Sequence, residues 1–196
     1  MESTRLFIAA PLPLPVKIAL VSAQARLRRV GAPVRWVAAE AMHLTLHFLG
    51  ETDTALVPAI EGVMQQICTN HSALQLCLTT TGAFPNSRRP NVLWAGIGGD
   101  TDALGQIAAT LQNALAQIGL AEDMRPFRPH LTLGRTRRDA PPQMIERLGD
   151  TIRALPQLTP TRWECERIVL FRSELRREGP HYTALAECSL LPARTR

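Results

Sequence analysis

One block of four residues occurs twice in this chain and limits the folds that it can adopt. His43-Leu-Thr-Leu46 recurs as His130-Leu-Thr-Leu133 in the second half. Both copies lie in β-prone runs, which favours a strand for each. Each copy also follows a segment in which apolar residues recur at helical spacing. The simplest interpretation is two related lobes, one from each half of the chain, each contributing one such strand.

The remaining sequence predicts a mixture of helices and strands. Apolar residues at helical spacing predict helices over residues 16–30, 56–67, 104–118 and 142–155. Short β-prone runs predict strands at 5–10, 34–37, 43–49, 74–81, 92–97, 130–135, 162–171 and 181–190, with a turn-rich segment at 84–90. Because the two element types do not alternate strictly, we expect an α+β fold with a largely antiparallel sheet.

Composition excludes two broad classes of protein. The chain has 196 residues, of which 45% are hydrophobic and 20% charged, and this balance argues against disorder and against a polytopic membrane protein. Residues 6–25 are rich in apolar side chains, but Pro11, Pro13 and Pro15 interrupt them, which is unlike a secretory signal. The four cysteines, at positions 68, 77, 165 and 188, form no CxxC pair. We therefore expect reduced thiols and a cytoplasmic protein.

The charge predicts an anionic partner. The net charge is +5, and of the 22 basic residues only Lys17 is a lysine. The planar arginine side chain suits phosphate groups, which favours nucleic acid over other anions.

The repeated block suggests a catalytic pair. On a strand, His43 and Thr45 project to one face and the leucines to the other, and the same holds for His130 and Thr132. If the two strands face each other across a cleft, two imidazoles and two hydroxyls converge. One histidine then acts as the base on an attacking water, the other as the acid on the leaving oxygen, and the hydroxyls contact the phosphate. This arrangement predicts hydrolysis of a phosphodiester without a metal.

Two other interpretations of these residues remain open. A histidine beside a threonine often lies on a half-buried strand with no chemical role, although the repetition favours function. His43 and His47 would share one face of a helix and could bind zinc there, but Gly50 and the alternating pattern favour a strand. On a strand, His47 would lie two steps beyond Thr45 on the same face, at the rim of the cleft.

The residues around both copies carry a family resemblance. The matching segments are Arg5-Leu-Phe7, Val34-Arg-Trp-Val37, His43–Gly50, Phe84-Pro85, Val92–Gly96, Arg128–Arg135, Ser173 and Gly179-Pro-His-Tyr182. Together they resemble the two-histidine (2H) phosphoesterases, specifically the RNA 2′,3′-cyclic phosphodiesterases that are also described as 2′–5′ RNA ligases. The resemblance covers nearly the whole chain. It implies a single domain over residues 1–196, built as two pseudo-symmetric lobes whose mainly antiparallel sheets line a central cleft, with helices outside.

The resemblance also implies roles for individual residues. His43 would be the proton donor and His130 the proton acceptor, while Thr45 and Thr132 would bind the phosphate. Arg135 follows the second block at a position that is often basic in the family, and it could assist the phosphate. Strict alternation along the strand, however, would place Arg135 on the face opposite His130.

The implied activity is hydrolysis of RNA 2′,3′-cyclic phosphate ends to 2′-phosphomonoesters. We expect no metal or other cofactor, and a monomeric protein. The alternatives are 2′–5′ ligation of RNA ends and a non-catalytic module that binds nucleotides or RNA. Phe7 would either stack on a base or belong to the core. Arginines near the second block (125, 128, 135, 137 and 138) and near the final hairpin (172, 176 and 177) would either hold the RNA backbone or form ordinary solvated surface.

Overall fold

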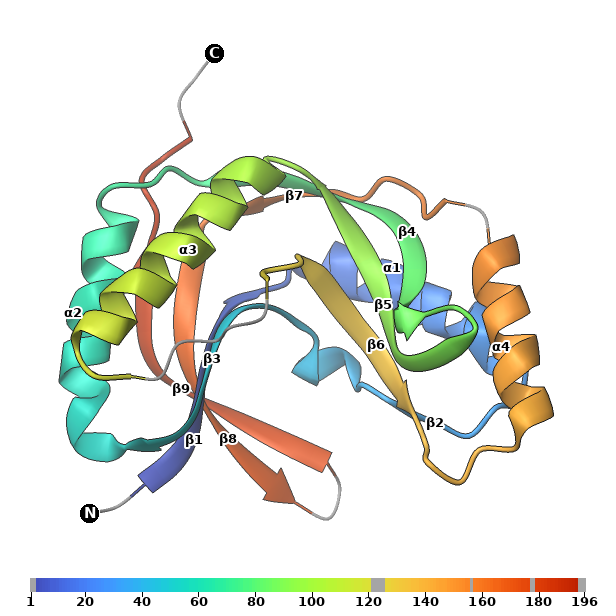
Figure 1. Cartoon of the computed structure of the whole chain (residues 1–196). Coiled ribbons are helices and arrows are strands. Elements are labelled where there is room, and N and C mark those ends of the chain that lie inside the picture. Colours follow the sequence, from blue (N-terminus) through green and yellow to red (C-terminus); the bar gives the residue numbers. More distant parts are fainter. Residues whose placement is uncertain (1–2, 121–125, 156, 177–178, 194–196) are drawn as a thin grey trace.

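The computed structural model describes residues 3–120, 126–155, 157–176 and 179–193 (Figure 1). The helices are α1 (Leu14–Arg28), α2 (Val57–Cys68), α3 (Thr101–Gln117) and α4 (Pro142–Ala154). The strands are β1 (Ser3–Pro11), β2 (Val34–Trp36), β3 (His43–Asp53), β4 (Leu74–Asn86), β5 (Arg89–Gly99), β6 (His130–Thr136), β7 (Arg162–Cys165), β8 (Arg167–Arg176) and β9 (Gly179–Ser189). These elements confirm the predicted α+β fold.

The strands form one curled sheet of nine strands. Its order is β7-β4-β5-β6-β3-β1-β8-β9, with β2 paired to β6 beside this path. All paired strands are antiparallel. The two sheets expected from the resemblance are joined at the centre by a single residue pair, Leu44 with Leu131. The two strands that begin with the repeated block are therefore neighbours in the middle of the molecule.

The sheet has a pseudo-twofold arrangement about the junction of β3 and β6, with four strands of the order on each side. The β3 lobe consists of β3, β1, β8 and β9, covered by α2 and α3, and the β6 lobe consists of β6, β5, β4, β7 and β2, covered by α1 and α4 (Figure 1). Each lobe takes elements from both halves of the chain, so the expectation of one lobe per half is wrong. The reason is that β5 pairs with β6 and β8 with β1, while α1 and α3 each pack on the lobe opposite their preceding strand.

One apolar core extends through both lobes. The leucines of the repeated block, at positions 44, 46, 131 and 133, are buried in it, as the alternating pattern predicts. Cys68, Cys165 and Cys188 lie in the same core. Burial raises the pKa of Cys68 to about 12 and that of Cys165 to about 11, so these thiols stay protonated. Within the described residues, no helix is long and apolar enough to cross a membrane.

Two strand boundaries differ from the expectation. The segment 84–90, predicted as turn-rich, continues β4 and β5, so that only Ser87 and Arg88 form the turn. The run 162–171, predicted as one strand, is divided at Glu166 into β7 and β8. These two strands lie in different lobes, since β7 pairs with β4 and β8 with β1. Continuous β propensity carries no information about the partner of each part, which only tertiary contacts decide.

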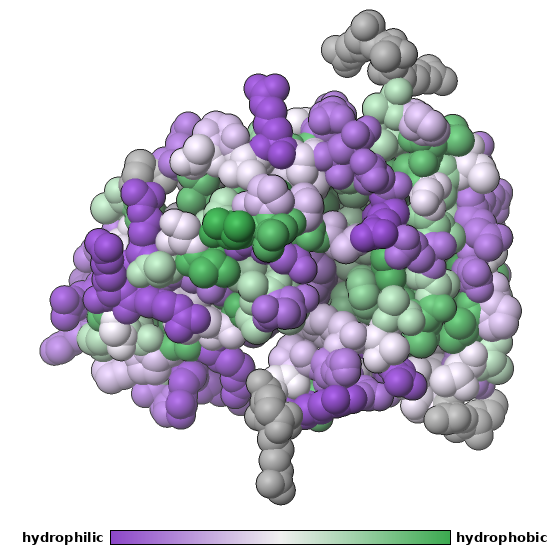
Figure 2. Space-filling view, turned by 180° about the vertical axis from the view of Figure 1, so that it is seen from behind, coloured by the Kyte–Doolittle hydropathy of each residue, from purple (hydrophilic) through white to green (hydrophobic). Residues whose placement is uncertain are grey.

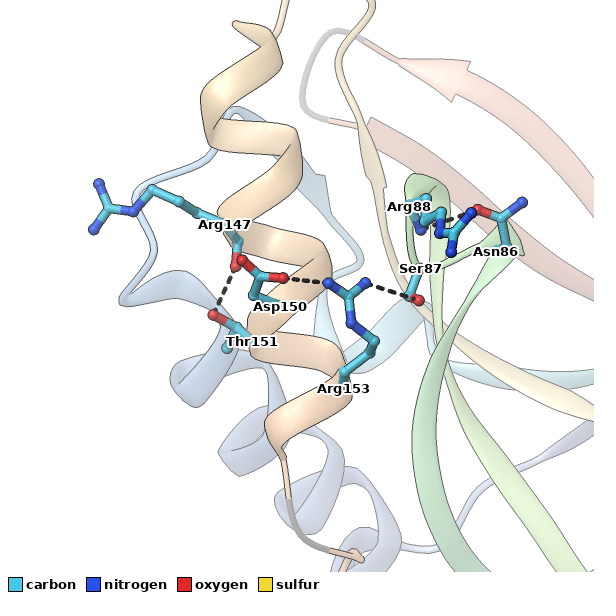
Figure 3. Close-up of polar contacts among 7 residues, drawn as sticks. All are labelled: Asn86, Ser87, Arg88, Arg147, Asp150, Thr151 and Arg153. Atoms are coloured by element: carbon cyan, nitrogen blue, oxygen red, sulfur yellow. Dashed lines mark hydrogen bonds and ion pairs between the residues drawn. The ribbon is translucent and has the colours of Figure 1, made fainter.

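Polar contacts hold α4 against the turn between β4 and β5 (Figure 3). Arg153 forms an ion pair with Asp150, and its other terminal nitrogen donates to the Ser87 hydroxyl at 3.2 Å. The helix approaches the turn at Gly149, where a Cβ atom would lie 2.0 Å from the Ser87 carbonyl oxygen. Only glycine allows this approach, which fixes α4 on the outside of the β6 lobe.

The outer surface carries an apolar patch on the side shown in Figure 2. Helix α1, at the back of Figure 1, exposes Leu14, Ile18 and Val21, whose exposed fractions are 68%, 60% and 44%. These residues recur at helical spacing, opposite the buried stripe of the same helix. The patch therefore belongs to the outer face of α1, away from the repeated strands.

Candidate active site

A β-bulge in β3 decides which side chains share a face with His43. Thr45 lies opposite Ala9 and His47 opposite Ile8, so Leu46 is an extra residue in the ladder. Directly opposite residues of antiparallel strands point to the same face. The face of His43 and Thr45 therefore continues at the next position of this ladder with Phe48, which lies opposite Phe7.

The second copy has the same bulge. In β6, Thr132 lies opposite Trp94, Gly134 opposite Leu93, and Arg135 opposite Val92. The extra residue is Leu133, which shifts the alternation by one. The inference from strict alternation is therefore wrong, because Arg135 lies on the face of His130 and Thr132.

His47 lies on the other face of the sheet. It is only 4% exposed and is opposite Ile8, which is fully buried. The predicted position at the rim of the cleft is wrong, because the bulge reverses the alternation after Thr45. The zinc hypothesis is wrong for the same reason, since His43 and His47 point to opposite faces of a strand.

The two histidines are held by equivalent hydrogen bonds, each from Nδ1 to a backbone carbonyl oxygen. Nδ1 of His43 lies 2.8 Å from the carbonyl oxygen of Ala41, and Nδ1 of His130 lies 2.6 Å from that of Arg128. A carbonyl oxygen only accepts, so Nδ1 carries the proton in each ring. Nε2 of each ring is thereby left to accept or donate a proton on the substrate side.

Aromatic rings support both imidazoles. His43 contacts both Phe7, at 4.8 Å, and Tyr182, at 5.3 Å, measured between ring centroids. The ring of Phe84 meets His130 edge-on at 5.0 Å. Phe7 is only 4% exposed, which favours the core interpretation of this residue over base stacking. These contacts restrict the orientation of the catalytic candidates.

The two histidines interact electrostatically. Burial lowers the pKa of His43, the hydrogen bond to Ala41 partly opposes this, and the charge of His130 lowers the pKa further. Burial also lowers the pKa of His130, with the Arg128 carbonyl opposing and the charge of Arg135 adding to the effect. Because a proton on one ring disfavours a proton on the other, the pair favours one acid and one base.

Comparison with known proteins agrees with this geometry. The family profile of the 2′-5′ RNA ligase superfamily matches residues 16–177. The chain belongs to this superfamily. It is 33% identical to the RNA 2′,3′-cyclic phosphodiesterase of Thermus thermophilus over 95% of this chain and 90% of that protein.

Two solved structures of bacterial proteins show the same fold. The protein TT0787 of Thermus thermophilus superposes with a TM-score of 0.81 and 30% identity, over 97% of this chain and all of the other. LigT of E. coli in complex with 3′-AMP superposes with a TM-score of 0.76 and 27% identity, over 96% and 99% of the two chains. The two-histidine phosphoesterase fold expected from the resemblance is thus confirmed.

Within this superfamily fold, several neighbours of the site were not assigned from the sequence. Tyr182 and Phe84 contact the histidines, and Phe48 is 51% exposed on the face of His43. Aligning the two copies beyond their fourth residue would have marked Phe48, because it occupies the position that Arg135 has in the second copy. Tyr182 and Phe84 come from distant strands, and only the fold brings them to the site.

The arginine groups are only partly at the site. Arg172 and Arg176 both pair with Glu174, at 3.2 and 2.8 Å, and their register places them on the face opposite Tyr182. Arg137 pairs with Asp139 at 3.0 Å. Arg125 and Arg177 lie outside the described residues. Arg135 acts on the site through its charge. This charge lowers the pKa of His130 and opposes the rise that burial causes in the pKa of Tyr182.

Proposed function

We propose that this protein hydrolyses 2′,3′-cyclic phosphate ends of RNA to 2′-phosphomonoesters. The observation that carries the proposal is the matched pair of histidines, His43 and His130, held alike through Nδ1 and interacting electrostatically. Relatives named RNA 2′,3′-cyclic phosphodiesterase, which are 33% and 30% identical to this chain over most of its length, support it.

The proposed reaction transfers one proton to the pair and one from it. Nε2 of neutral His130 takes a proton from a water molecule, whose oxygen attacks the phosphorus. Nε2–H of protonated His43 donates its proton to the 3′ oxygen as the bond from phosphorus to that oxygen breaks. The product keeps its phosphate on the 2′ oxygen, and His130 ends protonated and His43 neutral. Exchange of protons with solvent restores the starting state.

The hydroxyls and Arg135 would stabilise the charged phosphate. Thr45 and Thr132 are half-buried on the histidine face, one on each strand. Their hydroxyls can donate to the non-bridging oxygens as negative charge increases in the transition state. Arg135 adds a cation on the same face, and charge-assisted hydrogen bonds are the stronger kind.

The nucleoside would lie toward the β3 lobe. Phe48 is exposed on the face of His43, with Phe7 and Tyr182 nearby. A base can stack on such a ring without any hydrogen bond that identifies it. We therefore expect the enzyme to accept cyclic phosphates with different bases.

Ligation is the second candidate, because the family to which the chain belongs is named for it. A 5′-hydroxyl of another RNA would replace the attacking water and form a 2′–5′ link, with the same two histidines. A module that only binds nucleotide is the third, and it would bind without turnover.

The test is to incubate the purified protein with adenosine 2′,3′-cyclic phosphate, with and without EDTA. We expect 2′-AMP in both samples, because the two histidines supply acid and base. Formation of 3′-AMP would contradict the proposed bond cleavage, and loss of activity in EDTA with recovery on adding a divalent ion would contradict the mechanism. Adding an RNA with a 5′-hydroxyl separates ligation from hydrolysis by product length.

A further inference from the structure

A second arginine lies beside Arg135, on a strand that the proposed reaction does not use. In the register of β2 and β6, Arg35 is directly opposite Arg135. Directly opposite residues of antiparallel strands share a face, with Cβ atoms about 4.5–5.5 Å apart. Both side chains are exposed. Arg35 therefore belongs to the face that carries His130 and Thr132.

Like charges at directly opposite positions destabilise a sheet unless something compensates them. Among the residues that the structure describes, neither Arg35 nor Arg135 is ion-paired, whereas Arg137, Arg153 and Arg167 each have a carboxylate partner. The open pair of guanidinium groups thus has the charge and the donors of a site for an anion.

The Gln24 side chain and packing against the core hold β2 in this place. The buried Gln24 side chain donates to the carbonyl oxygens of Val37 and Leu133, both at 2.8 Å, and so joins β2 to the bulge of β6. Val34 and Trp36, on the other face of β2, pack against the core. The position of Arg35 is therefore set by the fold before any ligand binds.

The arginine pair occupies the next position after Thr132 on the same face of the sheet. Thr132 is opposite Trp94 and Arg135 opposite Val92, and these partners are two residues apart. Two residues of an antiparallel strand span about 7 Å, which is similar to the separation of neighbouring phosphates in extended RNA. A cyclic phosphate at Thr132 would therefore bring the next phosphate of the chain to the arginines.

We propose that Arg35 and Arg135 form a second phosphate subsite, which binds the 5′-phosphate of the terminal nucleotide. This inference rests on the proposed function and extends it. Arg135 lies near His130 and can reach both phosphates, whereas Arg35 contacts only the second. The substrate class is then an RNA chain or a 5′-phosphorylated nucleotide, in preference to a nucleoside cyclic phosphate.

The test compares two substrates that differ only in the 5′-phosphate, adenosine 2′,3′-cyclic phosphate and its 5′-phosphorylated form. We expect kcat/KM of the unmodified enzyme to be about tenfold or more higher for the phosphorylated substrate. This factor is the usual contribution of one hydrogen bond to a charged group. Arg35→Gln should lower kcat/KM for the phosphorylated substrate about tenfold more than for the other. Arg35→Lys should keep part of the preference, because it keeps the charge but not the fork.

Arg162→Gln is the matched control, because it removes an exposed arginine from β7 at the far end of the sheet. It should leave the ratio of the two kcat/KM values unchanged. Thermal unfolding of each variant shows whether the fold is intact. The inference is overturned if the unmodified enzyme uses both substrates equally, or if Arg35→Gln lowers both by the same factor.

If neither substrate is hydrolysed, the proposed function fails and binding decides the subsite. The dissociation constant of adenosine 2′,5′-bisphosphate is then compared with that of 2′-AMP. A loss of affinity in Arg35→Gln that is about tenfold larger for the bisphosphate supports the subsite. Equal losses for the two ligands overturn it.

Discussion

Strands β3 and β6 begin with the same four residues and then diverge. Both carry a bulge after the threonine, and both hold their histidine by Nδ1 to a carbonyl oxygen two residues earlier. After the block, β3 continues with His47 and Phe48, whereas β6 continues with Gly134 and Arg135. The comparison shows a symmetric pair of histidines, the proposed catalytic pair, in asymmetric surroundings that are apolar on one side and cationic on the other.

A single position accounts for much of this asymmetry. A Cβ atom at Gly134 would lie 2.8 Å from Val34 Cγ1 and 3.1 Å from the carbonyl oxygen of Arg35. Glycine thus lets β2 pair with β6, and β2 brings Arg35 to the site. The matching position in β3 holds His47, which is buried opposite Ile8. An asymmetric substrate, with a base at one end and a phosphate chain at the other, fits such surroundings in one direction.

Removing either histidine tests the symmetric pair, and it should have the largest effect on kcat. His43→Ala and His130→Ala should each lower kcat by about 10²–10⁴-fold, since a general acid and a general base contribute that much each. The measurement is the rate of hydrolysis of a nucleoside 2′,3′-cyclic phosphate at saturation.

The double variant is the control for a shared mechanism. Its loss should be smaller than the product of the two single losses, because groups that act as a unit are not additive. Full activity in either single variant, with an unchanged circular dichroism spectrum, would contradict the assignment.

Removing the cation from the β6 side should come next. Arg135→Gln should lower kcat/KM by about tenfold or more, through loss of a charged contact to phosphate. It should also raise the pKa of His130, because the charge of Arg135 lowers it. If His130 is the base, the acidic limb of the kcat/KM profile moves to higher pH.

The same profile assigns the two roles. In the unmodified enzyme we expect the acidic limb below the ordinary histidine pKa of 6.5, since the pKa of each histidine is lowered. A shift of the alkaline limb alone in Arg135→Gln would show that His130 is the acid and His43 the base, the reverse of the proposal.

Removing the apolar side should have a moderate effect. Phe48→Ala should lower kcat/KM for adenosine 2′,3′-cyclic phosphate by a factor that corresponds to about 1–3 kcal/mol, the usual contribution of an aromatic ring stacked on a base. Phe48→Tyr keeps the ring and is the matched control. Equal kcat/KM values for all three proteins would mean that no base stacks at this position.

Replacing His47 should have the smallest effect on catalysis. His47→Ala removes a buried side chain from the helix-covered face, so we expect a loss of about 0.5–3 kcal/mol in the free energy of unfolding. Both limbs of the kcat/KM profile should stay where the unmodified enzyme has them. A displaced limb would show that His47 acts on His43 through the sheet.

The periodicity of the sequence was a good guide to the elements and a poor guide to their partners. Helices and strands lie close to their predicted positions, because apolar spacing reports burial directly. The run 162–171 illustrates the failure. Its two halves have similar β propensity, yet β7 pairs with β4 and β8 with β1.

By itself, the sequence predicted the two histidines and two threonines of the candidate site and determined the burial of the leucines beneath them, because the repeated block specifies both the residue types and the period of the strand. Only the tertiary structure decided where Arg135 and His47 point. Each follows a bulge, and a bulge is visible only in the pairing of two strands. The same holds for Arg35 and Tyr182, which reach the site from separate strands. Sequence alternation describes one strand, whereas a catalytic face is built by several.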